Sequence, residues 1–204
     1  MKNPIKKGNI SLEVIVMTHE KIFAIRNSIK GSDVKEIRKK LNLTQKEFSS
    51  LVNSSIKTIE NWEMSDEKIK GPIVTLIKML NIYQDFASDF KIQESQYPLR
   101  LWYMFKEEVC TLIDVDEKNR KIEIYNYTND LIFRAFGKNE DPSYDEYQGF
   151  IESRCFPKNR DNLKVYLREL DIPFYEPLMI IERTLGKMAD DNFWIRIERE
   201  NNHD

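Results

Sequence analysis

The chain has 204 residues, of which 41% are hydrophobic, and a formal net charge of −2. This length and apolar content exclude wholesale disorder and are sufficient for two small domains with cores of their own. No apolar run approaches the roughly 20 residues needed to cross a bilayer, and the two cysteines, Cys110 and Cys155, lack the CxxC spacing of a zinc site, so we expect a cytoplasmic protein without a membrane partner.

The first expected element is an N-terminal segment, residues 1–32. It opens with a basic, polar arm and continues as ISLEVIVMTHEKIFAIRNSI, which is rich in apolar residues without a clean period. Helix and strand therefore both remain open. We favour an extended opening followed by a short helix, which either covers the next domain or forms a dimer contact.

A helical domain is expected next, over residues 33–82. Asp33 is suited to cap a helix that ends at Leu41, because an aspartate side chain accepts hydrogen bonds from the first free backbone N–H groups. Thr44, with a glutamate three residues later, forms the capping box of a second helix. Pro72 occupies the first position of the last helix, where its missing N–H group is not needed.

A tight turn separates the second and third helices of this domain. Asn53 tolerates the left-handed backbone that a sharp turn requires. Ser55 can cap the third helix, in which Ile59 and Trp62 lie on one face. Two short helices joined in this way allow the second helix to enter the major groove of DNA while the first crosses the phosphate backbone.

The string LTQKEFSSLVNSSIKTIENWE, residues 43–63, resembles the Cro/repressor (XRE) family of helix-turn-helix domains and is most similar to the MqsA- and HigA-type antitoxins. One departure is Asn53, where the family usually carries glycine. The resemblance implies that a homodimer binds double-stranded DNA at an inverted-repeat operator, with Gln45 contacting a phosphate or a base. It also implies a groove-facing set, in which Ile56 touches a thymine methyl group: Ser55, Ile56, Lys57, Thr58 and Asn61. The alternative is that these are solvated residues on an ordinary helical pair.

Residues 83–97 are polar and are expected to form a linker or a helical extension that ends before Pro98. An acidic α+β domain is expected to follow over residues 98–204. Its runs at 109–115 and 121–127 are rich in β-branched and aromatic residues and flank a polar turn. This pattern predicts a β-hairpin.

Three helical segments and a strand complete the expected second domain. Segments 143–156, 161–170 and 176–185 carry apolar residues at three- or four-residue intervals, and Gly186 stops the last one. Residues 192–198 alternate enough to make a closing strand. The expected fold class is therefore α+β, with an N-terminal all-α helix-turn-helix bundle and a C-terminal α+β domain of a β-hairpin and about three helices.

The second half contains a further resemblance, from Leu101 to Glu198, to a small module found beside HipA-like serine/threonine kinases. The matching residues are Arg154, Pro157, Arg160, Gly186, Asp191 and Trp194. The resemblance implies a protein partner, either a HipA-like kinase or another toxin or defence protein. Arg154, Lys158 and Arg160 are the candidate partner-binding residues, since arginine presents a planar fork that suits carboxylate or phosphate. The alternative is that they pair with nearby acids such as Asp161 and Glu169.

Catalytic chemistry finds little support in the sequence. The only histidines are His19 and His203, neither of which belongs to a nucleophile arrangement, and no phosphate-binding loop or other catalytic motif occurs. Asp190 and Asp191 are adjacent carboxylates without a third ligand, which is more typical of surface charge than of a metal site. We therefore expect a binding protein rather than an enzyme, with neither a metal nor a cofactor.

Charge distinguishes the two halves. Residues 1–95 carry 16 Lys and Arg against 12 Asp and Glu, and residues 96–204 carry 16 against 22, so the first half suits nucleic acid and the second half another partner. Aromatic residues of the acidic half could stack on bases, but core packing is their more common role. They are Trp102, Tyr103, Phe105, Tyr125, Tyr127, Phe133 and Phe136.

These features predict a sequence-specific DNA-binding transcriptional regulator of the autorepressor or antitoxin kind, associated with the nucleoid when it occupies its operator. Its C-terminal domain would bind a partner protein. The alternative is that the C-terminal domain is an inhibitor or adaptor of a bacterial or phage defence system, and that the helix-turn-helix domain only regulates its own promoter.

Overall fold

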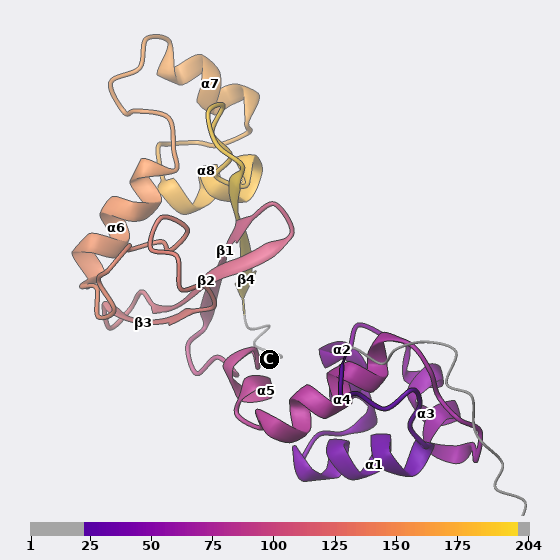
Figure 1. Cartoon of the computed structure of the whole chain (residues 1–204). Coiled ribbons are helices and arrows are strands. Elements are labelled where there is room, and N and C mark those ends of the chain that lie inside the picture. The colour runs from indigo at the N-terminus through magenta and orange to yellow at the C-terminus, as the bar shows by residue number, and fades with distance from the viewer. Residues whose placement is uncertain (1–22, 200–204) are drawn as a thin grey trace, which may run out of the picture. The chain divides into compact units, whose positions relative to one another are not determined.

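The computed structural model describes residues 23–199, so the basic arm and most of the N-terminal segment 1–32, in which a dimer contact was expected, lie outside the described residues. Within them the fold is α+β, with eight helices and a four-stranded antiparallel sheet. The chain divides into two compact units, Met1–Ser88 and Asp89–Asp204, each with its own core (Figure 1). We call them the first and the second unit. Their boundary falls inside the stretch 83–97.

The first unit is helical. Its helices are α1 (Gly31–Lys40), α2 (Gln45–Leu51), α3 (Ile56–Met64) and α4 (Pro72–Ile82), and the short α5 (Phe86–Asp89) spans the boundary. Each of the first four helices contributes a residue that is almost completely buried: Val34, Phe48, Ile59 and Leu80. Their apolar stripes therefore meet in a single core, which fixes the orientation of every helix.

The cap signals of α2, α3 and α4 are confirmed, but α1 begins earlier than expected. Its first residue is Gly31 and the capping position is Lys30, while Asp33 lies in the first turn and its carboxylate accepts the Lys30 N–H at 2.8 Å. Gly31 is required because a Cβ atom there would overlap the carbonyl oxygen of Trp62 at the end of α3. Residues 23–30, the described part of the segment in which a short helix was expected, contain no helix, and Ile29 forms an antiparallel bridge with Ile69.

The second unit contains the sheet. Its strands are β1 (Leu99–Phe105), β2 (Glu108–Asp116), β3 (Lys121–Asn126) and β4 (Phe193–Arg199), in the order β3-β2-β1-β4. Its helices are α6 (Tyr144–Ser153), α7 (Leu163–Glu169) and α8 (Pro177–Thr184). The predicted hairpin, the three helices and the closing strand are confirmed. The central strand β1, which pairs with both β2 and β4, was not predicted.

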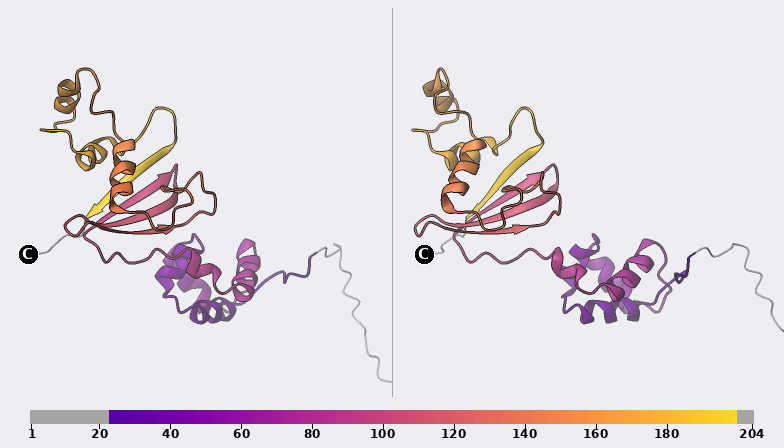
Figure 2. Two further views of the ribbon diagram at one scale, coloured as in Figure 1. Left: turned by 90° about the vertical axis from the view of Figure 1, so that its left-hand side faces the viewer. Right: turned by 60° about the vertical axis from the view of Figure 1, so that its left-hand side comes forward.

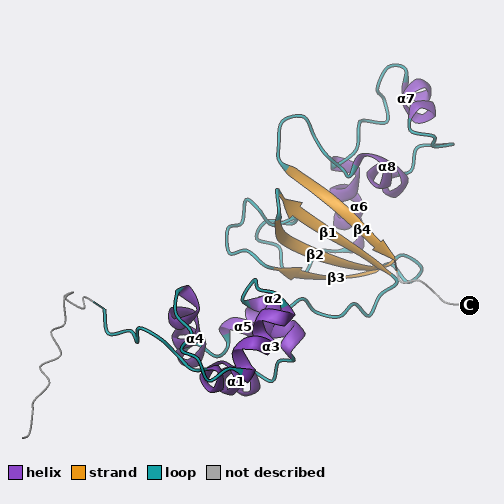
Figure 3. Cartoon of the chain, turned by 90° about the vertical axis from the view of Figure 1, so that its right-hand side faces the viewer, coloured by secondary structure: helices purple, strands orange, loops and turns teal. Residues whose placement is uncertain are grey.

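One face of the sheet packs against α6 and α8 (Figures 2 and 3). Since side chains alternate between the faces of a strand, Leu101 and Tyr103 of β1 point towards these helices and belong to the main core. Four of the aromatic residues expected in the core are found there: Tyr103, Phe105, Phe133 and Phe136. Trp102 and Tyr125 are outside this cluster and point to the opposite face.

None of the helices in residues 23–199 combines the length and apolar character needed to span a bilayer.

Candidate nucleic-acid interface

Helices α2 and α3 are joined by a turn of four residues, 52–55. Asn53 adopts a positive φ of 50°, as expected for a residue that tolerates the left-handed region. The Ser54 N–H donates to the Ser49 carbonyl at 2.8 Å, and the Ser55 hydroxyl accepts the Thr58 N–H at 3.0 Å. The end of α2 and the start of α3 are therefore both closed by local hydrogen bonds, which leaves the turn little freedom.

A buried ion pair fixes the position of α3 relative to its neighbours. Arg38 of α1 donates from Nε and Nη2 to the two Glu63 carboxylate oxygens at 2.6 and 2.9 Å. Gln45 of α2 donates to the same carboxylate at 3.1 Å. The Glu63 side chain is only 4% exposed, and the hydrogen bonds from Arg38 hold its pKa below the usual value. Three helices thus share one carboxylate.

The outer face of α3 is accessible. Lys57 and Asn61 lie four residues apart, and therefore on one face of the helix; both are exposed. Within residues 23–199, neither side chain forms a hydrogen bond. Ile56, at the start of the helix, is 42% exposed. These three side chains are free to contact another molecule.

The remaining members of the predicted set have internal partners. The hydroxyls of Ser55 and Thr58 lie 2.8 Å apart, so both serve the cap of α3. Gln45 is half-buried and its amide nitrogen is bound to Glu63, so this group is directed inwards. The predicted DNA-contacting set therefore divides into three side chains without an internal partner among residues 23–199 and three whose hydrogen bonds hold the helix pair together.

Two accessible residues were missed. Met64 is 86% exposed and continues the stripe of Lys57 and Asn61 at the next helical interval, a spacing that could have identified it. Lys46 is exposed in the first turn of α2. Glu63, the acidic residue near the end of α3, is neutralised internally by Arg38. The acidic charge facing outwards from α3 is therefore smaller than the sequence suggests.

The predicted partner-binding residues do not form one anion-binding corner. Arg154 is buried. It donates to both Asp191 oxygens at 2.6 and 3.1 Å and to the carbonyls of Gly186 and Phe193 at 3.0 Å each. All three of its nitrogens are used inside the second unit. Arg154 is thus a structural residue that joins the end of α6 to the start of β4.

Lys158 and Arg160 lie at the surface with separate partners. Lys158 pairs with Glu152 at 2.8 Å, and the Arg160 guanidinium lies 4.2 Å from the ring centre of Tyr166. The acids considered from the sequence, Asp161 and Glu169, are not their partners. Binding of a partner protein by these two residues stays a prediction.

One of the two adjacent carboxylates, Asp191, also has a structural explanation. Asp191 accepts from Arg154 and from the Phe193 N–H at 3.0 Å, and the hydrogen bonds from Arg154 lower its pKa. In the described part of the chain, no group of three or more side chains of metal-binding type comes together. Asp191 therefore serves to start β4.

No family model matches this chain, and no curated protein matches it. The accessible face of α3 must therefore be interpreted from its own geometry and chemistry.

Proposed function

We propose that this chain is a sequence-specific DNA-binding transcriptional regulator, of the autorepressor or antitoxin kind, in which α3 enters the major groove. One observation carries the proposal: Ile56, Lys57 and Asn61 are accessible on a helix whose opposite face, at Ile59, is completely buried. A short helix held rigidly on one side and polar on the other is suited to reading base edges.

The accessible side chains have complementary chemistry for this role. An asparagine amide can pair with the N6 and N7 atoms of adenine, and a lysine can bind guanine or a phosphate. Ile56 can contact a thymine methyl group. Arg38 and Glu63 contribute indirectly, since their ion pair fixes the angle at which α3 is presented.

The test is a selection of binding sites from random DNA duplexes with the full-length protein. We expect an inverted repeat whose half-sites lie about 34 Å apart, because each copy of a dimer presents one reading helix. Asn61→Ala should relax the preference at one base position and cost about 1–3 kcal/mol at the selected site. Lys57→Ala should weaken binding to all sequences and lower the salt dependence, if it contacts a phosphate.

Lys164→Ala is the matched control, because it removes an exposed lysine from α7 in the acidic second unit. It should leave the affinity unchanged. Selection of sites without two-fold symmetry, or full affinity in a folded double variant Lys57→Ala, Asn61→Ala, would contradict the proposal.

The second unit is proposed to bind a partner protein, which would be a HipA-like kinase or another toxin or defence protein. The separate core of this unit supports a role of its own. If the partner prefers the DNA-bound form, DNA and partner raise each other's affinity by the same factor. Adding the purified partner should then shift the DNA titration of the full-length chain.

A further inference from the structure

One large apolar side chain, Met64, lies on the outer face of α3. It is 86% exposed, the highest value among the large hydrophobic residues in the described part of the chain. Met64 follows Lys57 by seven residues and Asn61 by three, so the three side chains share one face of the helix. The core residue Ile59 points to the opposite side. An apolar group therefore continues the polar stripe of α3.

The backbone that carries Met64 is held on both sides. Before it, the Glu63 carboxylate is bound by two nitrogens of Arg38. After it, the Ser65 N–H donates to the Asn61 carbonyl at 3.1 Å, which closes the end of the helix. The Cα atom of Met64 is therefore fixed, and its exposure is a property of the side chain rather than of a frayed helix end.

An apolar side chain on a reading helix has one matching group in the major groove. The base edges there present hydrogen-bond donors and acceptors, and the apolar group among them is the C5 methyl group of thymine. Methionine is unbranched and has three rotatable bonds, so the side chain of Met64 can adjust to the position of such a methyl group. Contact between the two removes apolar surface of both from water, which stabilises the complex.

The spacing along α3 identifies the base pair concerned. An α-helix rises 1.5 Å per residue, so Met64 lies about 4.5 Å beyond Asn61 and about 10 Å beyond Lys57 along the axis. Successive base pairs are about 3.4 Å apart. With the helix axis along the groove, Met64 lies one or two base pairs beyond the base that Asn61 reads, on the side away from Lys57.

The loop that follows α3 does not oppose this approach. Its residues 65–70 contain Asp66 and Glu67, but also Lys68 and Lys70, and all four are exposed. The loop therefore has no net charge, and repulsion of the phosphates by the two carboxylates is offset by the two lysines.

We infer that Met64 is a specificity-determining residue that contacts the C5 methyl group of one thymine in each half-site. The inference rests on the proposed function and deepens it, since it assigns a thymine to the operator one or two base pairs from the base read by Asn61. Recognition of that thymine then depends on one methyl group and one side chain.

The test uses the full-length protein and the duplex obtained from the selection of binding sites. Each thymine of one half-site is replaced in turn by uracil, which removes the methyl group and keeps every hydrogen-bonding atom. Asn61→Ala locates the base that Asn61 reads. At the thymine one or two base pairs beyond it, we expect the replacement to weaken binding about four-fold, the factor that corresponds to one buried methyl-sized group.

Variants of Met64 show whether this side chain reads the methyl group. Met64→Ala should bind uracil and thymine duplexes equally at this position, whereas uracil replacement at any other thymine should keep its effect. Met64→Gln, which is similar in length but polar, should also lose the discrimination, and the apolar Met64→Leu should retain it. All three replacements favour helix formation. Met188→Ala, which removes an exposed methionine from the second unit, is the matched control and should change neither affinity nor discrimination.

The outcomes separate this inference from the proposed function. If random duplexes yield no preferred sequence, both are wrong. If a site is selected but the wild type is insensitive to uracil at the expected position, or Met64→Ala remains as sensitive as the wild type, the role of Met64 is wrong while the proposed function stands. A loss of discrimination at this one position in Met64→Ala and Met64→Gln, with Met64→Leu unaffected, supports the assignment.

Discussion

At the scale of single residues, three arginines hold distant parts of the chain together. Each binds a carboxylate through two nitrogens and also donates to a backbone carbonyl: Arg38 to Glu63 and Leu43, Arg100 to Asp114 and Gln93, and Arg154 to Asp191 and Gly186. The planar guanidinium suits this double task, because its donors point in fixed directions. A lysine in the same place would satisfy only part of each set.

The first prediction concerns Arg154. Arg154→Met should lower the free energy of unfolding of the second unit by about 3 kcal/mol, because Asp191 and two carbonyls lose their donor in a partly buried site. The measurement is urea denaturation followed through Trp102 and Trp194 fluorescence in a Trp62→Phe background. Lys158→Met, an exposed residue with a surface partner, is the control. A loss no larger than that of the control would contradict the structural role.

The second prediction is the pH dependence of the first unit. Hydrogen bonds from Arg38 lower the pKa of Glu63 in the folded protein. The folded state therefore binds the Glu63 proton more weakly than the unfolded state, in which the pKa of a glutamate is about 4.3. The stabilisation is therefore present above that value and is lost as the pH falls through the folded pKa. The free energy of unfolding of the wild type should decrease below pH ~4. Glu63→Gln should be less stable near neutral pH and show a flatter profile between pH 2 and 5, and identical slopes would contradict the assignment.

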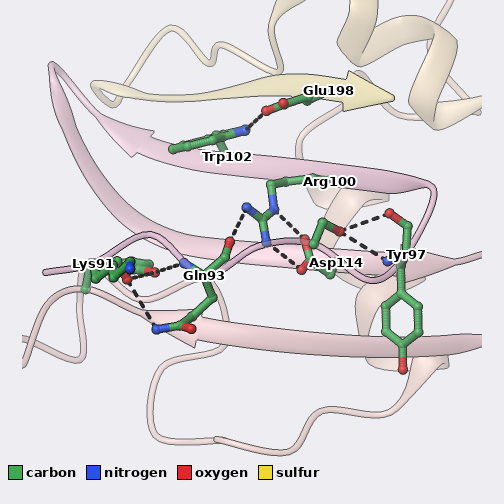
Figure 4. A network of polar contacts seen from close by, with 9 residues as sticks. Lys91, Gln93, Tyr97, Arg100, Trp102, Asp114 and Glu198 are labelled. Atoms are coloured by element: carbon green, nitrogen blue, oxygen red, sulfur yellow. Dashed lines mark hydrogen bonds and ion pairs between the residues drawn. The ribbon is translucent and has the colours of Figure 1, made fainter. Parts of the chain in front are cut away.

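At the scale of elements, the sequence predicted those whose signals are local. The caps Thr44 and Ser55 act over three residues, so α2 and α3 were located correctly. The strand β1 was missed because both of its faces are covered. The charged Arg100 is buried because it pairs with Asp114, which lies 14 positions later in the chain (Figure 4). Gln45 was expected to contact DNA on the family resemblance, and the sequence did not show its internal partner Glu63, which lies 18 positions away. Pairings over such distances have no local periodic signal.

The third prediction tests the turn between α2 and α3. Asn53 has a φ of 50°, which an alanine adopts only with strain. Asn53→Ala should therefore destabilise the first unit by about 1 kcal/mol, whereas Asn53→Gly should stay within about 0.5 kcal/mol of the wild type. Thermal unfolding of both variants provides the measurement. Equal stability of the alanine and glycine variants would show that the turn adopts another backbone conformation.

At the scale of the whole molecule, the stretch 83–97, expected to be a linker or a helical extension, is partly structured. Residues 86–89 form α5, and the segment that follows is bound to the sheet of the second unit. Tyr127 accepts the Gln93 N–H at 3.3 Å and donates to the Lys91 carbonyl at 3.1 Å. The part of residues 83–97 that is neither helical nor bound to the sheet is therefore short. The composition of this stretch could not show this, because the side chains that bind it, Arg100 and Tyr127, belong to β1 and to the end of β3.

The last prediction follows from this attachment. Arg100 is 6% and Asp114 1% exposed, so Arg100→Met leaves a buried carboxylate unpaired and removes the donor that holds the Gln93 carbonyl. Segments with weakened hydrogen bonds open more often and are cut more readily by proteases. Trypsin should cleave after Lys91 about ten-fold faster in Arg100→Met than in the wild type, since a loss of about 1.4 kcal/mol in closing energy gives that ratio. The products, residues 1–91 and 92–204, are identified by mass.

Arg168→Met is the control, because it removes an exposed arginine from α7. It should leave the cleavage rate unchanged. Equal rates in all three proteins would show that the ion pair does not hold the connecting segment on the sheet.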